Sequence, residues 1–333
     1  MGPTWKFYYG PSDDQPAPSP TSETIQDMVT GMSDVAQMVI AQSGWRANPL
    51  GEVPPYFNDL INVWPNLPAL AAPHPFEFAS FGINFFDQGT GVAQLVTPND
   101  SDNDWIDNSD AVAKYRQVAL ALCSAPYNAR YIALALEVNS YCDRTSRDDY
   151  LYFVQSVYIP IYDAIKAIDP TVKVFVTFQL EQMKGLGNEW GFTPKAHWDL
   201  LAQYQGKLDL LAFTTYPEFI YGNPQDIPDD YYSSILASVP DALKNKPLAF
   251  VELGWSDSAG TIATQRAQVD FLSRFLVLTQ GLKMEYANWV FLHDEHTQPA
   301  NPKLRLGLDD YNGNQRPIWQ AWAALKARPY APL

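Results

Sequence analysis

The feature of this sequence that most constrains its fold is a repeated alternation of two kinds of segment. Short runs of β-branched and aromatic residues alternate with helix-length amphipathic segments, about eight times at similar spacing. We expect strands at 5–9, 37–42, 78–86, 131–139, 173–179, 208–216, 248–254 and 286–293. We expect helices near 22–34, 57–63, 108–123, 147–167, 195–204, 229–242, 262–279 and 317–326. This pattern predicts an α/β fold of the (β/α)₈ TIM barrel type.

The length and the loops fit one such barrel. A chain of 333 residues can hold a barrel of roughly 250 residues together with long loops, so we expect a single domain over 1–333. The loops predicted after the second strand (44–55 and 65–75) and after the third (88–108) are long and rich in Pro, Gly, Asn and Asp. In such barrels the loops after the strands build the active site. A doubly wound sheet is the alternative fold, but no Gly-x-Gly-x-x-Gly follows an early strand.

The charge and the aromatic content narrow the classes of partner. The chain has 37 acidic and 22 basic residues, and its net charge of −15 repels nucleic acids and anionic membranes. Ten Trp and nineteen Tyr suit the stacking of sugar rings, although core packing accounts for part of them. No nucleophile elbow, phosphate loop or basic patch interleaved with aromatics appears. A neutral carbohydrate is the partner that we expect, without nucleic acid or membrane insertion.

The location of the protein is constrained only weakly. The chain begins at Met1 without the charged and apolar stretches of a secretory signal. We expect a secreted or periplasmic protein whose signal has been removed, with the cytoplasm as the alternative, and we expect a monomer. Cys123 and Cys142 are predicted at opposite ends of the barrel, roughly 30 Å apart, so we expect two free thiols.

Two glutamates occupy matching positions in the predicted strands. Successive side chains of a strand point to opposite faces, and in 131–139 the bulky apolar residues share one face while Glu137 and Asn139 share the other. Glu137 is therefore predicted to point into the mouth of the barrel. In 248–254 the same alternation turns Glu252 inward at the same level.

Inward carboxylates at the ends of apolar strands call for a chemical reason. A buried carboxylate is unfavourable unless it is paired or hydrogen-bonded, and pairing with a nearby cation or contact with solvent is one explanation. The other is glycoside cleavage, in which two carboxyl groups about 5–5.5 Å apart serve as acid/base and nucleophile with retention of configuration. The predicted strands of Glu137 and Glu252 face each other across the mouth, which suits that separation.

Three strand ends resemble those of a known set of enzymes. Glu137, the run from Glu252 to Trp255 and Thr215-Tyr216-Pro217 resemble clan A retaining glycoside hydrolases, nearest to the endo-β-1,4-galactanases and endo-β-1,3-glucanases. The resemblance implies that Glu137 is the acid/base, that Glu252 is the nucleophile and that Tyr216 hydrogen-bonds the nucleophile. The clan usually has Asn directly before the acid/base, where it holds the sugar 2-hydroxyl. This chain has Leu136, so Asn139 or another polar group would have to make that contact, or activity is altered or lost.

Further candidates for contacts with the substrate lie near the predicted strand ends. They are Trp289, His293, Asn139, Gln179, Trp45, Asn84 and Trp255. For two of the three tryptophans there are alternatives, which are core packing at Trp289 and support of the loop at Trp255. His293-x-x-His296 offers too few converging ligands for zinc, so we expect neither a metal nor a cofactor.

Three functions remain open on the sequence alone. The first is a retaining glycoside hydrolase that cleaves β-linked poly- or oligosaccharide by double displacement. The second is a carbohydrate-binding barrel that has lost turnover, which Leu136 suggests. The third is a transglycosylase, which shares the covalent intermediate and differs in the acceptor. The two opposed glutamates favour the first.

Overall fold

A computed structural model describes most of the C-terminal two thirds of the chain and three short segments before it. The described residues are 8–9, 38–44, 78–84, 109–125, 127–144, 147–186, 194–294, 305–310 and 312–326. The helices predicted at 22–34 and 57–63, the long loops after the second and third strands, and Trp45 lie outside them.

The strands form two parallel sheets. One has the order β2 (Met38–Gly44), β3 (Phe78–Asn84), β4 (Tyr131–Ala133) and β5 (Lys173–Phe175), and the other has the order β1 (Tyr8–Tyr9), β9 (Met284–Trp289), β8 (Leu248–Leu253), β7 (Leu211–Thr215) and β6 (Thr177–Gln179). β5 and β6 are separated only by Val176, so together they form the predicted strand at 173–179 and join the sheets.

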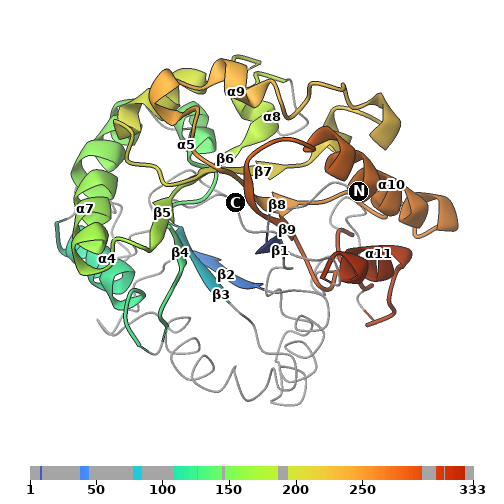
Figure 1. The fold of residues 1–333 in the computed structure, drawn as a ribbon, viewed down its shortest axis with the longest axis horizontal. Coiled ribbons are helices and arrows are strands. Elements are labelled where there is room, and N and C mark those ends of the chain that lie inside the picture. The colour runs from blue at the N-terminus through green and yellow to red at the C-terminus, as the bar shows by residue number, and fades with distance from the viewer. Residues whose placement is uncertain are drawn as a thin grey trace.

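The order of the strands is that of a (β/α)₈ barrel. β1 pairs with β9, so the first strand meets the last, and all the ladders between neighbours are parallel. Within the described segments, β1 and β2 are the two neighbours that no ladder joins. The strands lie at the centre with the helices around them (Figure 1). The predicted fold class is confirmed.

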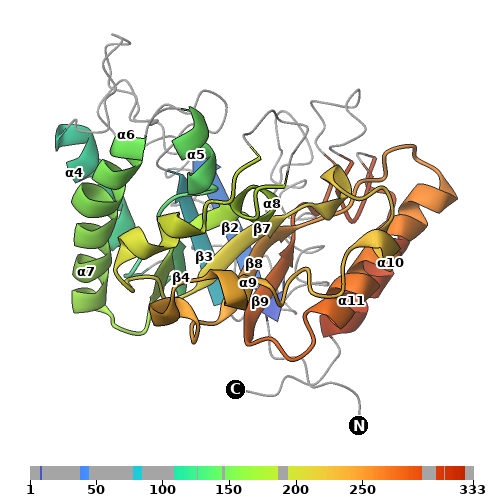
Figure 2. The same ribbon diagram turned by 90° about the horizontal axis from the view of Figure 1, so that it is seen from above.

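The helices follow the strands as the pattern predicts, with three differences in type, one of which is that Phe153–Tyr158, within the segment predicted at 147–167, forms a π-helix. They are α4 (Ser109–Ala121), α5 (Val138–Arg144), α6 (Arg147–Tyr152), η2 (Phe153–Tyr158), α7 (Ile159–Ile168), α8 (Leu180–Met183), η3 (Trp198–Tyr204), η4 (Pro217–Phe219), η5 (Pro224–Asp226), α9 (Ile235–Ser238), η6 (Asp241–Leu243), α10 (Ile262–Leu278) and α11 (Pro317–Lys326). The segment predicted at 195–204 forms a 3₁₀ helix, η3. The segment predicted at 229–242 holds only the single turns α9 and η6, because Pro240 interrupts it. Figure 2 shows α7 on one side of the strands and α10 and α11 on the other.

The strand predicted at 131–139 is shorter than expected. β4 ends at Ala133, the chain bends over 134–137, and α5 begins at Val138. Pairing with the next strand nevertheless continues, because the Leu134 N–H donates to the Phe175 carbonyl and the Thr177 N–H to that of Ala135. The parity argument is therefore wrong for Asn139, which lies in the first turn of α5 and not on an inward strand face.

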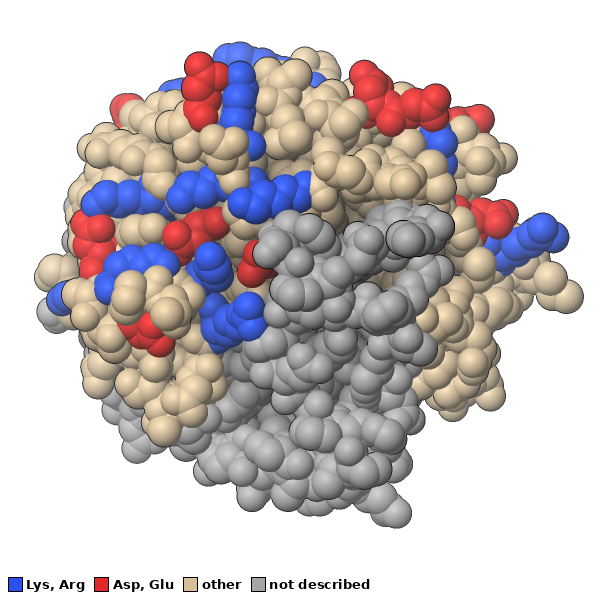
Figure 3. Space-filling view, in the orientation of Figure 1, with Lys and Arg blue, Asp and Glu red and all other residues tan. Residues whose placement is uncertain are grey.

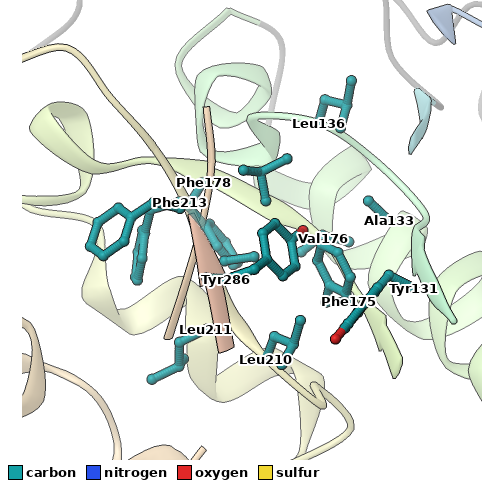
Figure 4. Close-up of a cluster of buried hydrophobic side chains, with 14 of the residues drawn as sticks. Tyr131, Ala133, Leu136, Phe175, Val176, Phe178, Leu210, Leu211, Phe213 and Tyr286 are labelled. Atoms are coloured by element: carbon teal, nitrogen blue, oxygen red, sulfur yellow. The ribbon is translucent and has the colours of Figure 1, made fainter. Parts of the chain in front are cut away.

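Large apolar side chains fill the interior of the barrel. Figure 4 shows a cluster of them contributed by β4, β5, β6, β7 and β9. The rings of Tyr131 and Tyr286, from strands far apart in the sequence, meet edge to face with centroids 5.2 Å apart. The Tyr131 hydroxyl donates to Glu285 at the start of β9, 3.0 Å away. Such layers of side chains set the stability of a barrel and leave its mouth available for function.

Charged residues of both signs share the surface. In Figure 3, Lys and Arg lie among Asp and Glu over the part of the molecule where Figure 1 places α7 and α9. Lys207, for example, pairs with Asp163 of α7 at 2.5 Å. None of the described helices combines the length and the apolar character needed to cross a bilayer.

A buried arginine ties the C-terminal helix to the loops after β8 and β9. The Arg316 guanidinium, 4% exposed, donates to Asp257 at 3.2 Å and to both carboxylate oxygens of Asp294 at 2.8 and 2.5 Å. It also donates to the carbonyls of Gly307 and Asp309. Both carboxylates are buried with it.

We predict that Arg316→Met lowers the free energy of unfolding by about 3–5 kcal/mol, because it leaves two buried carboxylates without their cation. Denaturant unfolding followed by circular dichroism measures this loss. The control is Arg266→Met, which removes an exposed Arg266–Asp270 pair at 3.9 Å and should change stability by less than about 1 kcal/mol. Equal losses in the two variants would contradict the role given to Arg316.

Candidate active site

The C-terminal end of β7 contacts two glutamates through residues on one face of the strand. Thr214 Oγ1 donates to Glu137 Oε1 at 2.5 Å, and the Tyr216 hydroxyl donates to Glu252 Oε2 at 2.6 Å. Residues two apart in an extended segment point to the same side. Both carboxylates therefore lie on the same side of β7, although Glu137 and Glu252 are more than a hundred residues apart in the sequence.

Glu137 has a backbone conformation that is rare for its residue type. Its φ of 47° lies in the left-handed region, which is unfavourable for side chains other than Gly and Asn. Two hydrogen bonds hold it there: its N–H donates to Thr177 Oγ1 at 2.8 Å, and its carboxylate accepts from Thr214. Strained backbone of this kind is concentrated at functional sites.

Glu252 lies where the ladders around β8 become irregular. The pairing of β7 with β8 shifts register between Phe213 and Thr214, and that of β8 with β9 shifts between Phe250 and Leu253. Such irregularities re-aim side chains next to active sites. Glu252 and Glu137 are each half-buried and so reach the surface of the molecule.

Close packing explains the glycine in the run from Glu252 to Trp255. A Cβ at Gly254 would lie 3.1 Å from a Val290 methyl, 3.2 Å from Leu306 and 3.4 Å from the Tyr216 ring. Tyr216, Val290 and Leu306 form a small apolar cluster of their own, with Phe219 and Phe291 against it. The Tyr216 ring is therefore packed against apolar neighbours, among them Phe219 with ring centroids 5.9 Å apart.

The Tyr216 hydroxyl remains a hydrogen-bond donor. Burial raises its pKa well above the ordinary value, and the charges of Glu252, Glu137 and then Glu181 raise it further, with the hydrogen bond to Glu252 adding to the effect. The three carboxylates thus surround the end of β7. The raised pKa keeps this hydroxyl protonated near neutral pH, so that it donates to Glu252.

A further carboxyl joins the loops after β7 and β8. Glu218 Oε2 accepts from the Ser256 N–H at 2.6 Å, whereas its Oε1 is buried without a partner among the described residues. Burial raises the pKa of Glu218 to about 7, although the hydrogen bonds from Ser256 oppose the rise.

Trp289 and Trp255, two of the tryptophans proposed as substrate contacts, are packed into the core. Trp289 is 0% exposed, its indole N–H donates to the Leu306 carbonyl at 2.6 Å, and its ring packs against Trp322 and Phe271. A sugar platform at Trp289 is therefore wrong. Trp255 is buried against Phe271, with ring centroids 5.4 Å apart, which agrees with the alternative that it supports the loop.

Asn139 and Gln179 also lie in the interior instead of at a substrate surface. The Asn139 amide donates to the Gln179 carbonyl and accepts from the Gln179 N–H, which joins α5 to β6. The Gln179 side chain accepts from the Gln182 N–H and donates to Glu181. Both residues are at most 1% exposed, so the predicted substrate contacts at these positions are wrong.

The remaining substrate candidates differ in how far the structure describes them. His293 is half-buried, with Nδ1 3.4 Å from Asp309. Burial lowers the pKa of His293 and raises that of Asp309 to about 7. Asn84 ends β3, where its backbone pairs with Gly44, and its side chain lies outside the described part, as does Trp45. Their predicted contacts stay predictions.

The sequence reasoning missed Thr214 and Thr177. Thr214 shares the strand parity of Tyr216, and that signal could have found it. Thr177 acts on Glu137, 40 residues away in the sequence, which no local pattern reveals. For Glu181, which follows the strand predicted at 173–179, the sequence leaves open a hydrogen-bonding role or exposure to solvent, and the structure buries it. Among the residues that the structure describes, no group of three or more His, Cys, Asp and Glu could hold a metal ion.

Comparisons with known proteins show a shared fold. No protein-family description matches the chain, and no curated protein matches it in sequence. A GH5_18 enzyme from Bifidobacterium longum is 15% identical with a TM-score of 0.68, over 99% of this chain and 81% of that one. A GH5_18 enzyme from Streptomyces cattleya, in complex with GlcNAc, is 13% identical with a TM-score of 0.67, over 99% and 83%.

An exo-β-1,4-mannosidase from an Opitutaceae bacterium is 14% identical with a TM-score of 0.69, over 98% of this chain and 60% of that one. At such low identities the likeness shows the fold. The chain has the barrel fold of these glycoside hydrolases.

We predict that Glu218→Gln becomes more stable relative to the wild type as the pH rises. The folded-state pKa of about 7 exceeds the ordinary 4.5, so the stability contributed by the neutral carboxyl is complete below pH 4.5 and is lost as the pH rises through 7. Gln resembles the neutral form at every pH. Denaturant unfolding should show the difference between the variants growing by up to roughly 3 kcal/mol from pH 4.5 to pH 8. If the difference in stability between Glu218→Gln and the wild type were the same at pH 4.5 and at pH 8, the raised pKa of Glu218 would be refuted.

Proposed function

We propose that this protein is a retaining glycoside hydrolase that cleaves β-linked oligo- or polysaccharide. The observation that carries the proposal is the end of β7, where Thr214 and Tyr216 each donate to a different half-buried glutamate. The shared barrel fold supports it. This chemistry requires two carboxyl groups that flank the scissile glycosidic bond.

In the first step Glu252 is the nucleophile. Its carboxylate attacks the anomeric carbon, an ester bond forms, and the bond from that carbon to the leaving-group oxygen breaks. Glu137 supplies the proton to the leaving oxygen. The hydrogen bond from Tyr216 to Glu252 Oε2 holds the carboxylate in one orientation.

In the second step the same residues reverse their roles. Glu137, now ionised, takes a proton from water, the water oxygen bonds to the anomeric carbon, and the ester bond to Glu252 breaks. The Thr214 hydroxyl donates to Glu137 Oε1 and so orients the carboxyl group for both proton transfers. The hydroxyl also stabilises the ionised form that accepts the proton from water.

The substrate belongs to the β-glycosides, and β-mannosides are the first class to test. One solved structure with this fold is an exo-β-1,4-mannosidase, and another, a GH5_18 variant from Bifidobacterium longum, contains Manβ1-4GlcNAc. A screen of the purified protein should include this disaccharide, β-mannan, β-1,4-galactan, β-1,3-glucan and xylan. Released reducing ends identify the substrate, and product lengths at high substrate concentration separate hydrolysis from transglycosylation.

A carbohydrate-binding barrel without turnover is the second candidate, because Leu136 precedes Glu137. Leu136 is buried and apolar, and the Asn139 amide is engaged with Gln179, so neither offers the sugar a polar contact. Calorimetric binding of an oligosaccharide that is recovered uncleaved would favour this candidate. Cleavage of the same oligosaccharide favours the hydrolase.

We predict that Glu137→Ala and Glu252→Ala each lower kcat by several orders of magnitude, because each removes a group that takes part in bond making or breaking. Initial rates on the best substrate measure this. The free energy of unfolding should change little, since both side chains are half-buried at the mouth. Glu285→Gln is the control. Glu285, at the start of β9, accepts a hydrogen bond from the Tyr131 hydroxyl, and the variant should keep normal kcat. Near-normal turnover in either alanine variant would refute the assignment.

We also predict that Glu137→Gln is nearly normal in glycosylation when the leaving group needs no proton. An aryl glycoside with a strongly acidic phenol departs without acid catalysis, so the variant should lose much more activity on the natural substrate than on this one. Pre-steady-state release of the phenol measures the step. If glycosylation were equally impaired on the two substrates, Glu137 would not be the general acid.

A further inference from the structure

A third glutamate, Glu181, lies fully buried behind the end of β7 and takes no part in the proposed chemistry. Its Oε1 accepts from Thr215 Oγ1 at 2.8 Å and from the Tyr231 hydroxyl at 2.7 Å. Its Oε2 accepts from Gln179 Nε2 at 2.6 Å and from the Tyr216 N–H at 3.2 Å. Four donors from three segments therefore converge on one carboxylate.

The set of donors matches the ionised form of Glu181. A carboxylate offers four lone-pair positions, and all four are used here, whereas a protonated carboxyl would bring a hydrogen against one of these donors. Burial raises the pKa of Glu181, and the bonds from Tyr231, Thr215 and Tyr216 oppose that rise. Lys184 lies nearby, with Nζ 4.6 Å from the Tyr231 ring centroid and 2.8 Å from Ser234 Oγ.

Glu181 holds the backbone from which the tyrosine of the active site projects. The Tyr216 N–H donates to Glu181 while its hydroxyl donates to Glu252, so the two ends of one residue are bonded to two carboxylates. Thr215, the preceding residue, is bonded to Glu181 by its side chain. A shift of this peptide would move the hydroxyl away from Glu252.

We propose that Glu181 is a positioning residue, which fixes the Thr215–Tyr216 peptide and through Tyr216 the orientation of Glu252. The inference rests on the proposed function, because its consequence is a rate of glycosyl transfer. Glu181 does not touch the substrate and does not exchange protons with it. Its contribution is geometric, and misplacement of a reacting group by about 1 Å can lower a rate about 100-fold.

The test compares Glu181→Gln with a matched variant at the other end of β7. In Glu181→Gln the amide NH₂ group faces two of the hydrogen-bond donors that the carboxylate accepted from, and this repulsion displaces the Thr215–Tyr216 peptide. The control is Asp209→Asn: Asp209 precedes β7, accepts from the Val174 N–H and the Tyr162 hydroxyl, and pairs with Lys166. Both variants are assayed at a temperature at which circular dichroism shows them folded.

Glu181→Gln should lower kcat about 10- to 100-fold with KM within about threefold of the wild type, whereas Asp209→Asn should leave both unchanged. Thr215→Val removes a single donor, is less disruptive to folding, and should lower kcat in the same direction by a smaller factor. Equal kinetics in Glu181→Gln and Asp209→Asn would overturn the proposal.

A double-mutant cycle tests the route through Tyr216. In a Tyr216→Phe background the hydroxyl is gone, so Glu181→Gln should then lower kcat by less than about threefold. If Glu181→Gln lowered kcat in the Tyr216→Phe background by as large a factor as it does in the wild type, the proposal would be overturned, because Glu181 would then act by another path.

A crystal structure of Glu181→Gln provides a readout that needs no turnover. The distance from the Tyr216 hydroxyl to Glu252 should exceed about 3.5 Å, beyond hydrogen-bonding range. A distance unchanged from 2.6 Å would overturn the inference even if the protein cleaved no glycoside. If the wild type is active, Glu252→Ala is inactive and Glu181→Gln behaves like Asp209→Asn, the inference alone fails.

Discussion

The arrangement of the site depends on the hydrogen bonds made by three consecutive residues at the end of β7. Thr214, Thr215 and Tyr216 donate to Glu137, Glu181 and Glu252 respectively. Hydrogen bonds to a carboxylate are shorter and stronger than those between neutral groups. The alternation of an extended strand sends the first and third donors to the mouth and the second behind it. One strand end thereby sets the positions of the two carboxylates that we propose as the reacting groups.

Three carboxyl groups close together repel one another when they are ionised, and the rest of the barrel offsets this repulsion. Glu181 is stabilised by four donors, and Glu137 keeps its left-handed backbone because Thr177 and Thr214 hold it from two sides. The aromatic interior below supplies the stability that a barrel needs. Strain and burial at the mouth are then the physical basis of the acid, base and nucleophilic roles that we propose for Glu137 and Glu252.

The sequence predicted the elements well and the surroundings of the site less well. Period and length identified α10 and α11 nearly to the residue, whereas the catalytic roles predicted for Glu137, Glu252 and Tyr216 stay predictions. The alternation of side chains along a strand does not apply beyond Ala133, where the chain leaves the strand, and so it gave the wrong position for Asn139.

Long-range contacts explain what no local pattern predicted. Trp289 has the polar edge expected of a sugar platform, but its N–H is satisfied by Leu306 in the core. The role of Glu181 depends on partners as far as 50 residues away, such as Tyr231.

The central claim, that Glu252 forms a covalent bond to the sugar, is tested most directly by trapping. A 2-deoxy-2-fluoro β-glycoside with an activated leaving group, of the sugar cleaved fastest, should accumulate as an ester. Mass spectrometry of the digested protein should place it on Glu252. Cleavage of the parent glycoside without any adduct, or an adduct on another residue, would contradict the account.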